Sequence, residues 1–211
     1  EITTSLFVSI SAVFSIILFW NGIQNNTYGN FKIFEWISSG NFVANWSINI
    51  DPLSSVMLVV VTFVSALVHI YSIGYMSHDP HKPRFMSYLS LFTFSMLVLV
   101  VSDNFLQLFF GWEGVGLCSY LLIGFWYKKE SANNAAIKAF IVNRVGDFGL
   151  AIGIFLIFFY FGTINFQEVF DLAPQFIEKK LIFFGFETTL ITLICLFLFI
   201  GAMGKSAQFL L

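Results

Sequence analysis

The sequence predicts an all-α polytopic membrane protein, a bundle of about six membrane-spanning helices with one short β-hairpin outside the membrane. Composition is the first reason: 58% of residues are hydrophobic, 10% are charged and the mean hydropathy is +0.85, which lies far outside the range of soluble globular domains. The second reason is pattern, because the apolar residues form runs long enough to cross a bilayer, with polar turns between them.

The spans follow one another in order. Thr4 to Trp20 is an apolar run without a charge, and Asp51 and Pro52 are typical of the N-cap and first position of the next helix. The second to sixth predicted spans are Leu53 to Tyr75, Phe85 to Val101, Phe105 to about Tyr127, Ala135 to Phe161, and Leu181 to at least Gly204.

Two segments are predicted to lie outside the hydrocarbon core. Residues 31–50 carry mixed aromatic and polar runs on either side of Ser38 to Asn41, which favours a hairpin at the membrane surface. Residues 163–180 are predicted to form an amphipathic or loop segment. The loops 76–84 and 128–134 each carry two basic residues and the turn 102–104 carries none, so the basic loops are expected to face the cytoplasm or mitochondrial matrix and the hairpin the outer side.

Several functions are not expected. The net charge of -2 offers no polybasic surface for nucleic acid. Cys118 and Cys195 lie far apart and are expected to be core residues, and the loop from His78 to His81 is expected to be an ordinary turn. Because the chain has no phosphate loop, dinucleotide fingerprint or catalytic triad, we expect it to contribute no catalytic, cofactor-binding or metal-ligating residue. We treat residues 1–211 as one membrane domain, truncated at both ends.

Glu113 is the one charge in its predicted span. An ionised carboxylate near the bilayer centre costs at least about 2.5 to 3.5 kcal/mol, so it must face protein, water or a cation, or hold a proton. The glycines at 111, 114 and 116 leave room for a neighbouring helix to approach it. Glu113 is therefore a candidate proton site, and the alternative is a structural carboxylate satisfied in the bundle core.

Other spans also hold ionisable residues. Arg144 and Asp147 are three residues apart, so they share a helix face and can pair. Lys138 lies about 14 Å from Asp147 along the axis and could instead extend to the basic side. His69 is either a proton relay or a satisfied core histidine.

Lys205 follows two glycines and precedes polar residues. Gly201 and Gly204, with Ser206 and Gln208 beyond the lysine, predict a locally weakened helix that lines a polar cavity. Lys205 would form a switchable pair with Glu113 if their helices touch.

These motifs together resemble one family, subunit 5 (subunit L in bacteria) of NADH:quinone oxidoreductase, respiratory complex I. They are GWEGVGLCSYLLIGFW at 111–126, KAF at 138–140, NRVGD at 143–147 and GKSAQ at 204–208. The resemblance covers nearly the whole chain and implies an antiporter-like bundle built from inverted repeats. The chain would hold roughly the second to seventh helices, and residues 84–208 part of the first repeat. Relatives usually have Pro or Gly where this chain has Leu210.

The resemblance also implies a function and residue roles. It makes Glu113 and Lys205 the proton-translocating pair, modulated by Arg144 and Asp147. The chain would be a non-redox, proton-translocating subunit of NADH:ubiquinone reductase, with NADH, FMN, iron–sulfur clusters and quinone bound in other subunits. Its partners would be other membrane subunits, lipid and protons, in a bacterial or mitochondrial inner membrane.

Three alternatives stay open. The large subunit of a multisubunit Na+/H+ antiporter shares the glutamate and lysine pattern. A chloroplast-type relative that accepts electrons from ferredoxin is disfavoured by Gly111 and Trp112 before the glutamate. In a passive structural subunit, the buried charges would only hold helices together.

Overall fold

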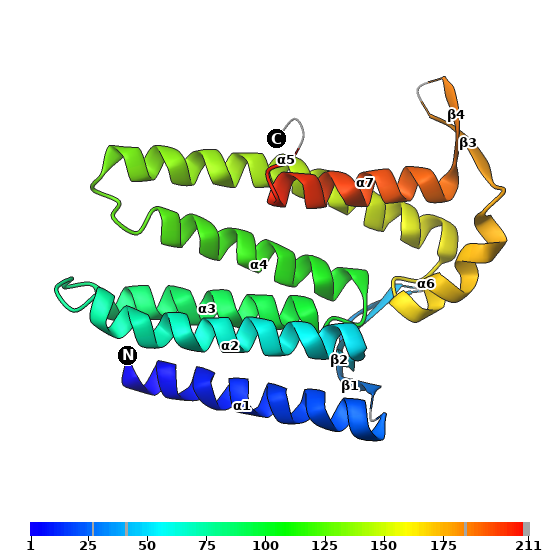
Figure 1. Cartoon of the computed structure of the whole chain (residues 1–211). Helices are drawn as coiled ribbons and strands as arrows, with labels where there is room; N and C mark the ends of the chain where they lie inside the picture. Colours follow the sequence, from blue (N-terminus) through cyan, green and yellow to red (C-terminus); the bar gives the residue numbers. More distant parts are fainter. Residues whose placement is uncertain (27, 41, 184, 209–211) are drawn as a thin grey trace.

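The computed structural model describes residues 1–26, 28–40, 42–183 and 185–208. Within these residues, five helices are long and apolar enough to cross a membrane, and they lie side by side as a bundle (Figure 1). This confirms the predicted fold class and the first five spans. The helices are α1 (Ile2–Asn25), α2 (Pro52–Tyr75), α3 (Lys82–Val100), α4 (Phe105–Ile123) and α5 (Glu130–Phe161).

The predicted start of the sixth span at Leu181 is wrong. The helix, α7 (Leu190–Lys205), begins nine residues after Leu181, because β3 (Lys180–Phe183) and β4 (Phe186–Thr189) pair as an antiparallel hairpin. Its turn contains Gly185 at φ 84°, a backbone conformation that glycine adopts without strain. With 16 residues, α7 is half as long as the 32-residue α5 and ends beside the middle of it (Figure 1).

The segment between α5 and this hairpin was predicted to be amphipathic or loop. It contains one short helix, α6 (Phe166–Leu172), followed by the 3-10 turn η1 (Ala173–Phe176). Asn165 caps α6 by accepting hydrogen bonds from the backbone N–H groups of Gln167 and Glu168. The segment is therefore partly helical and lies at the end of the bundle.

The predicted hairpin is confirmed as β1 (Gly29–Ser39) and β2 (Phe42–Ile50), which pair antiparallel from Gly29 opposite Ile50 to Ser39 opposite Phe42. Its β2 strand packs on α4. The backbone of Ser47 forms two hydrogen bonds with the side-chain amide of Gln107, at 3.0 and 2.8 Å, and both residues are buried. The hairpin is therefore fixed to the bundle.

The turn between α3 and α4 joins three parts of the bundle end that carries the hairpin. Asp103 is 7% exposed and accepts hydrogen bonds from the side-chain amides of Asn30, which pairs with Asn49 in the hairpin, and Asn165, the N-cap of α6. Its neighbour Asn104 donates to the carbonyl of Asn45 at 2.8 Å. One short turn thus connects the hairpin, the start of α4 and the α5–α6 connection.

The two ends of the bundle differ as the charge pattern predicts. The basic connections between α2 and α3 and between α4 and α5 lie at one end, while the hairpin, the 102–104 turn and α6 lie at the other (Figure 1).

Asp51 caps α2 in a capping box with Ser54, and Pro52 occupies the first turn, which confirms the predicted helix start.

Candidate functional site

Glycines press α4 closely against α3. A Cβ added to Gly111 would lie 2.7 Å from the backbone nitrogen of Leu99, and one added to Gly114 would lie 2.7 Å from the hydroxyl of Ser95. The predicted close approach of a neighbouring helix is confirmed at these two positions. With α4 held on α3 in this way, the side chains of Trp112 and Glu113, which lie between these glycines, reach α5.

Glycines also bring α7 onto α5. A Cβ on Gly146 would lie 3.0 Å from the Cα of Gly204, and one on Gly201 would lie 2.7 Å from the Cβ of Leu150. Both α7 glycines stay within regular helix, so the predicted weakening of the helix at the glycines is wrong: they serve close packing instead. The helix ends at Lys205 itself, and Leu210 lies outside the described residues.

The carboxylate of Glu113 forms an ion pair with the guanidinium of Arg144. Arg144 also lies 3.7 Å from Asp147, measured between Nη1 and Oδ2, which confirms the predicted pair on one face of α5. Arg144 is thus shared between carboxylates of two helices, and its guanidinium carbon lies 4.6 Å from the ring centroid of Phe140. The side chain of Asp147 is 5% exposed, that of Glu113 24% and that of Arg144 40%.

Lys205 reaches α4 at the residue before Glu113. Its Nζ donates to the backbone carbonyl of Trp112 at 2.8 Å and lies 5.1 Å from the centroid of the indole ring. Glu113 has its ion pair with Arg144 instead, so the predicted pair of Glu113 and Lys205 is not formed in this structure. Their helices do come together, and Lys205 and Arg144 contact adjacent residues of α4, Trp112 and Glu113.

Trp112 completes the cluster. Its indole N–H donates to Oδ1 of Asp147 at 2.7 Å, while its carbonyl holds Lys205. Two cations and two carboxylates from three helices are therefore joined in a line that runs from Lys205 through Trp112, Asp147 and Arg144 to Glu113. Sequence reasoning missed Trp112, although a buried indole N–H beside an intramembrane charge requires an acceptor and could have indicated its role.

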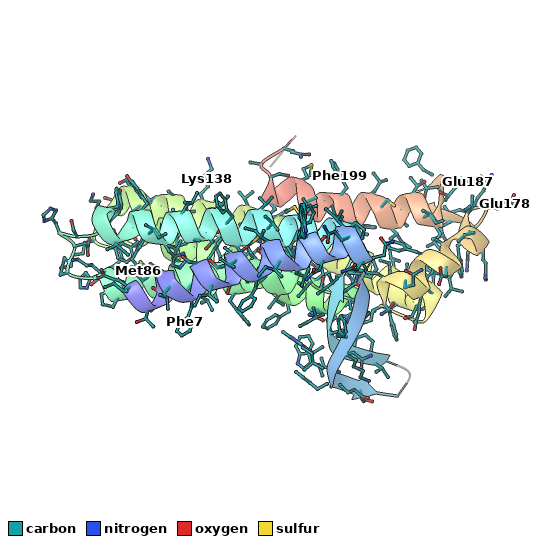
Figure 2. The ribbon with its side chains drawn as sticks, turned by 60° about the horizontal axis from the view of Figure 1, so that its bottom comes forward. Phe7, Met86, Lys138, Glu178, Glu187 and Phe199 are labelled. Carbon is teal, nitrogen blue, oxygen red and sulfur yellow. The ribbon has the colours of Figure 1, made fainter. Side chains whose placement is uncertain are left out.

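Two other predicted site residues lie apart from this cluster. His69 is fully buried between α2 and α3, where Nδ1 donates to the carbonyl of Ser65 at 2.8 Å and Nε2 lies 3.2 Å from the hydroxyl of Ser90. The hydroxyl of Ser65 in turn lies 2.5 Å from that of Thr93. Lys138 is exposed, and its side chain extends from α5 away from the bundle (Figure 2).

The cysteines differ from each other. Cys118 is buried as predicted, but Cys195 is exposed on α7, so the prediction of a core position is wrong for it. Hydropathy placed Cys195 in an apolar helix but could not say which face it occupies. Within the described residues, no group of three or more His, Cys, Asp or Glu side chains is placed to hold a metal ion.

Two sequence families match the chain. Residues 102–211 match the family described as NADH:quinone oxidoreductase/Mrp antiporter, TM, and residues 36–86 match the family described as NADH-Ubiquinone oxidoreductase (complex I), chain 5 N-terminus. The first match contains the whole charged cluster.

Individual relatives agree with the family matches. NADH-quinone oxidoreductase subunit L of Rickettsia bellii is 56% identical over 208 residues, and NADH-ubiquinone oxidoreductase chain 5 of Chondrus crispus is 56% identical over 206 residues. These alignments cover 99% and 97% of this chain but 32% and 31% of the relatives. The chain thus spans about a third of the length of the curated relatives it matches.

Solved structures share the fold. The Mrp complex from Dietzia sp. DQ12-45-1b contains a chain that superposes with a TM-score of 0.73 at 21% identity, covering 98% of this chain and 21% of that one. A chain of the membrane-bound sulfane sulfur reductase, an archaeal respiratory membrane complex, superposes with a TM-score of 0.69 at 16% identity. The superposition covers 95% of this chain and 29% of that one. These likenesses concern the arrangement of helices alone.

Proposed function

This chain belongs to the NADH:quinone oxidoreductase/Mrp antiporter transmembrane family, and we propose that it forms part of a multi-pass membrane subunit that translocates protons through buried charges. One observation carries the proposal: Glu113, Arg144, Asp147 and Lys205 meet inside the helical bundle through Trp112. Ionisable residues within membrane spans are costly, so a linked set of four indicates a pathway for charge.

The cluster couples proton uptake to proton release by charge balance. With Glu113 and Asp147 ionised and Lys205 protonated, two positive charges face two negative ones. A proton taken up by Glu113 leaves an excess positive charge, which favours loss of the proton from Lys205 because neighbouring titrations are coupled. Arg144 keeps its charge throughout and can only shift between its two carboxylates.

The wider setting follows the names of the relatives. We propose that the chain works as a non-redox part of complex I, the NADH:quinone oxidoreductase, in an inner membrane and among other membrane subunits. NADH oxidation by quinone would then take place in other subunits, which would hold the FMN and iron–sulfur clusters that the resemblance implies. His69 and Lys138 remain proposed members of the proton pathway, outside the charged cluster.

The Na+/H+ antiporter alternative is less well supported. The likeness to the Mrp complex chain is one of fold at 21% identity, whereas the subunit L and chain 5 relatives are 56% identical over nearly the whole chain. The passive structural alternative predicts a different result when Glu113 is neutralised. A structural carboxylate predicts that assembly is lost, whereas a proton site predicts that pumping is lost.

The test replaces Glu113 by Gln in the intact complex. NADH-driven proton uptake into membrane vesicles is measured together with electron-transfer rate and the amount of assembled complex. We expect normal assembly and at least about a tenfold loss of pumping, since a neutral amide cannot exchange the proton. Glu178→Gln, an exposed glutamate at the outer end, is the matched control. Normal pumping in assembled Glu113→Gln complex would refute the proposal, and pumping that depends on sodium would favour the antiporter alternative.

A further inference from the structure

We propose that Trp112 and Gly116 form a seat that positions the ammonium of Lys205 and links it to the carboxylate of Asp147. Trp112 is then a positioning residue for proton transfer and has no proton of its own to exchange. This inference rests on the proposed function and adds to it the element that connects Lys205 to the rest of the cluster.

The seat exists because Gly116 has no side chain. In an α-helix, the carbonyl of Trp112 points toward the N–H four residues later, and a side chain there lies close to that carbonyl. A Cβ added to Gly116 would lie 3.1 Å from Nζ of Lys205. The ammonium therefore lies against the open face of the glycine while it makes its 2.8 Å bond to the carbonyl, and an added methyl group would require Nζ to move by a few tenths of an ångström.

The indole ring provides a second contact for the same ammonium. Nζ of Lys205 lies 5.1 Å from the ring centroid of Trp112, within the range of a cation–π interaction. Both contacts favour a charged lysine over a neutral one. Both also come from one residue of α4, although Lys205 lies at the end of α7.

The other edge of the indole holds Asp147. The side chain of Asp147 is 5% exposed, and its Oδ1 accepts the indole N–H at 2.7 Å. Its Oδ2 is buried, lies 3.7 Å from Nη1 of Arg144 and accepts no hydrogen bond from the residues that the structure describes. The indole N–H can only donate a hydrogen bond and does not titrate, so it stabilises a hydrogen-bond acceptor at this position. A movement of Trp112 that releases Lys205 therefore also disturbs Asp147.

The first experiment separates the two roles of Trp112 in the intact complex. Trp112→Phe removes the N–H and keeps an aromatic ring and the backbone carbonyl. Trp126→Phe is the matched control, because Trp126 also donates its indole N–H to a carboxylate, Oδ2 of Asp79 at 3.0 Å, but in the connection between α4 and α5.

We expect Trp112→Phe to lower proton pumping about tenfold and to change its pH profile, because the loss of a hydrogen bond to a charged group is equivalent to about a tenfold change in an equilibrium. Assembly and the pH profile of Trp126→Phe should match the unmodified complex. A pH profile of Trp112→Phe that matches this control would overturn the link to Asp147.

The second experiment fills the seat. Gly116→Ala places a methyl group against the ammonium and is expected to lower pumping about tenfold through loss of a charge-assisted contact. Gly74→Ala is the control and should pump normally, because the added Cβ would meet no described residue within 4 Å beyond its own helical turns. Normal pumping in Gly116→Ala would overturn the seat.

A double variant guards against simple misfolding. If the bond matters, Trp112→Phe added to Asp147→Asn should change the pH profile less than it does alone, whereas a general packing defect should add its full effect. Glu113→Gln, measured in parallel, separates the two levels of the proposal. If the Glu113→Gln complex loses pumping while the Trp112→Phe and Gly116→Ala complexes pump as the unmodified complex does, the seat alone is refuted. If the Glu113→Gln complex pumps normally, proton translocation through the cluster is refuted.

Discussion

The carboxylate of Glu113 on α4 contacts the guanidinium of Arg144 on α5. The same guanidinium lies 3.7 Å from Asp147, so one permanently charged group serves two carboxylates. This arrangement leaves Lys205 to bind a backbone carbonyl and an aromatic ring, where its charge can be lost without breaking an ion pair. Arg144 holds the acidic groups in place, and Lys205 is the cation free to change its protonation state.

Replacing Arg144 by Gln should therefore harm assembly as well as pumping. Glu113 would be left without its cation, and breaking such a pair costs about 1 to 3 kcal/mol here, below the range for fully buried pairs because Arg144 is partly exposed. The amount and thermal stability of the assembled complex should fall. The double variant Glu113→Gln with Arg144→Gln should recover stability but not pumping. A stable single variant would contradict the structural role of the pair.

The close contact of α5 and α7 gives a second prediction. Gly204→Ala would bring a Cβ within 2.9 Å of the Cα of Gly146, so the helices must separate, at a cost of about 1 to 3 kcal/mol. Thermal inactivation of the complex should occur several degrees lower, whereas Gly74→Ala should leave it unchanged. Unchanged thermal inactivation of Gly204→Ala would show that α7 can move away without loss.

Most of the fold followed from hydropathy, because an apolar run longer than about 18 residues has few alternatives to a membrane span. The start of α7 could not be predicted in this way. Residues 181–186 are apolar, and hydropathy does not distinguish a strand pair there from the first turns of a helix. The turn at Gly185 was a usable signal, since a glycine within an apolar run indicates a possible hairpin.

The members of the charged cluster could be predicted, but most of its contacts could not. Glu113, Arg144, Asp147 and Lys205 are conspicuous as charges in apolar segments, and the spacing of two of them predicts their pair. Which charge meets which across helices depends on how each helix is rotated about its axis, and glycine contacts on α3 and α5 determine that rotation. Trp112 was missed because tryptophan is counted as a hydrophobic residue, and the polar contacts of its side chain and carbonyl exist only in the folded bundle.

The turn between α3 and α4 provides a test of how the hairpin is held. Asp103→Ala leaves the side-chain amides of Asn30, which is exposed, and Asn165, which is half-buried, without their shared acceptor, at a cost of about 0.5 to 1.5 kcal/mol for each hydrogen bond. Limited proteolysis should then cut the hairpin faster, with proton pumping per electron unchanged in the complex that remains. Asp171→Ala, at an exposed position of α6, should not change the cleavage rate. Equal cleavage of both variants would show that other contacts hold the hairpin.

The last prediction concerns pH at the opposite end. A hydrogen bond from the backbone N–H of His81, supported by one from Trp126, lowers the pKa of Asp79 below its usual value of 3.8. A lowered folded pKa contributes stability that is present above the unfolded pKa and is lost as pH falls through the folded one. Protection of the His81 amide from hydrogen exchange, corrected for intrinsic rates, should therefore be constant from about pH 8 to 5 and fall only below about pH 4. In Asp79→Ala it should be low throughout, and a wild-type loss of protection near neutral pH would contradict this assignment.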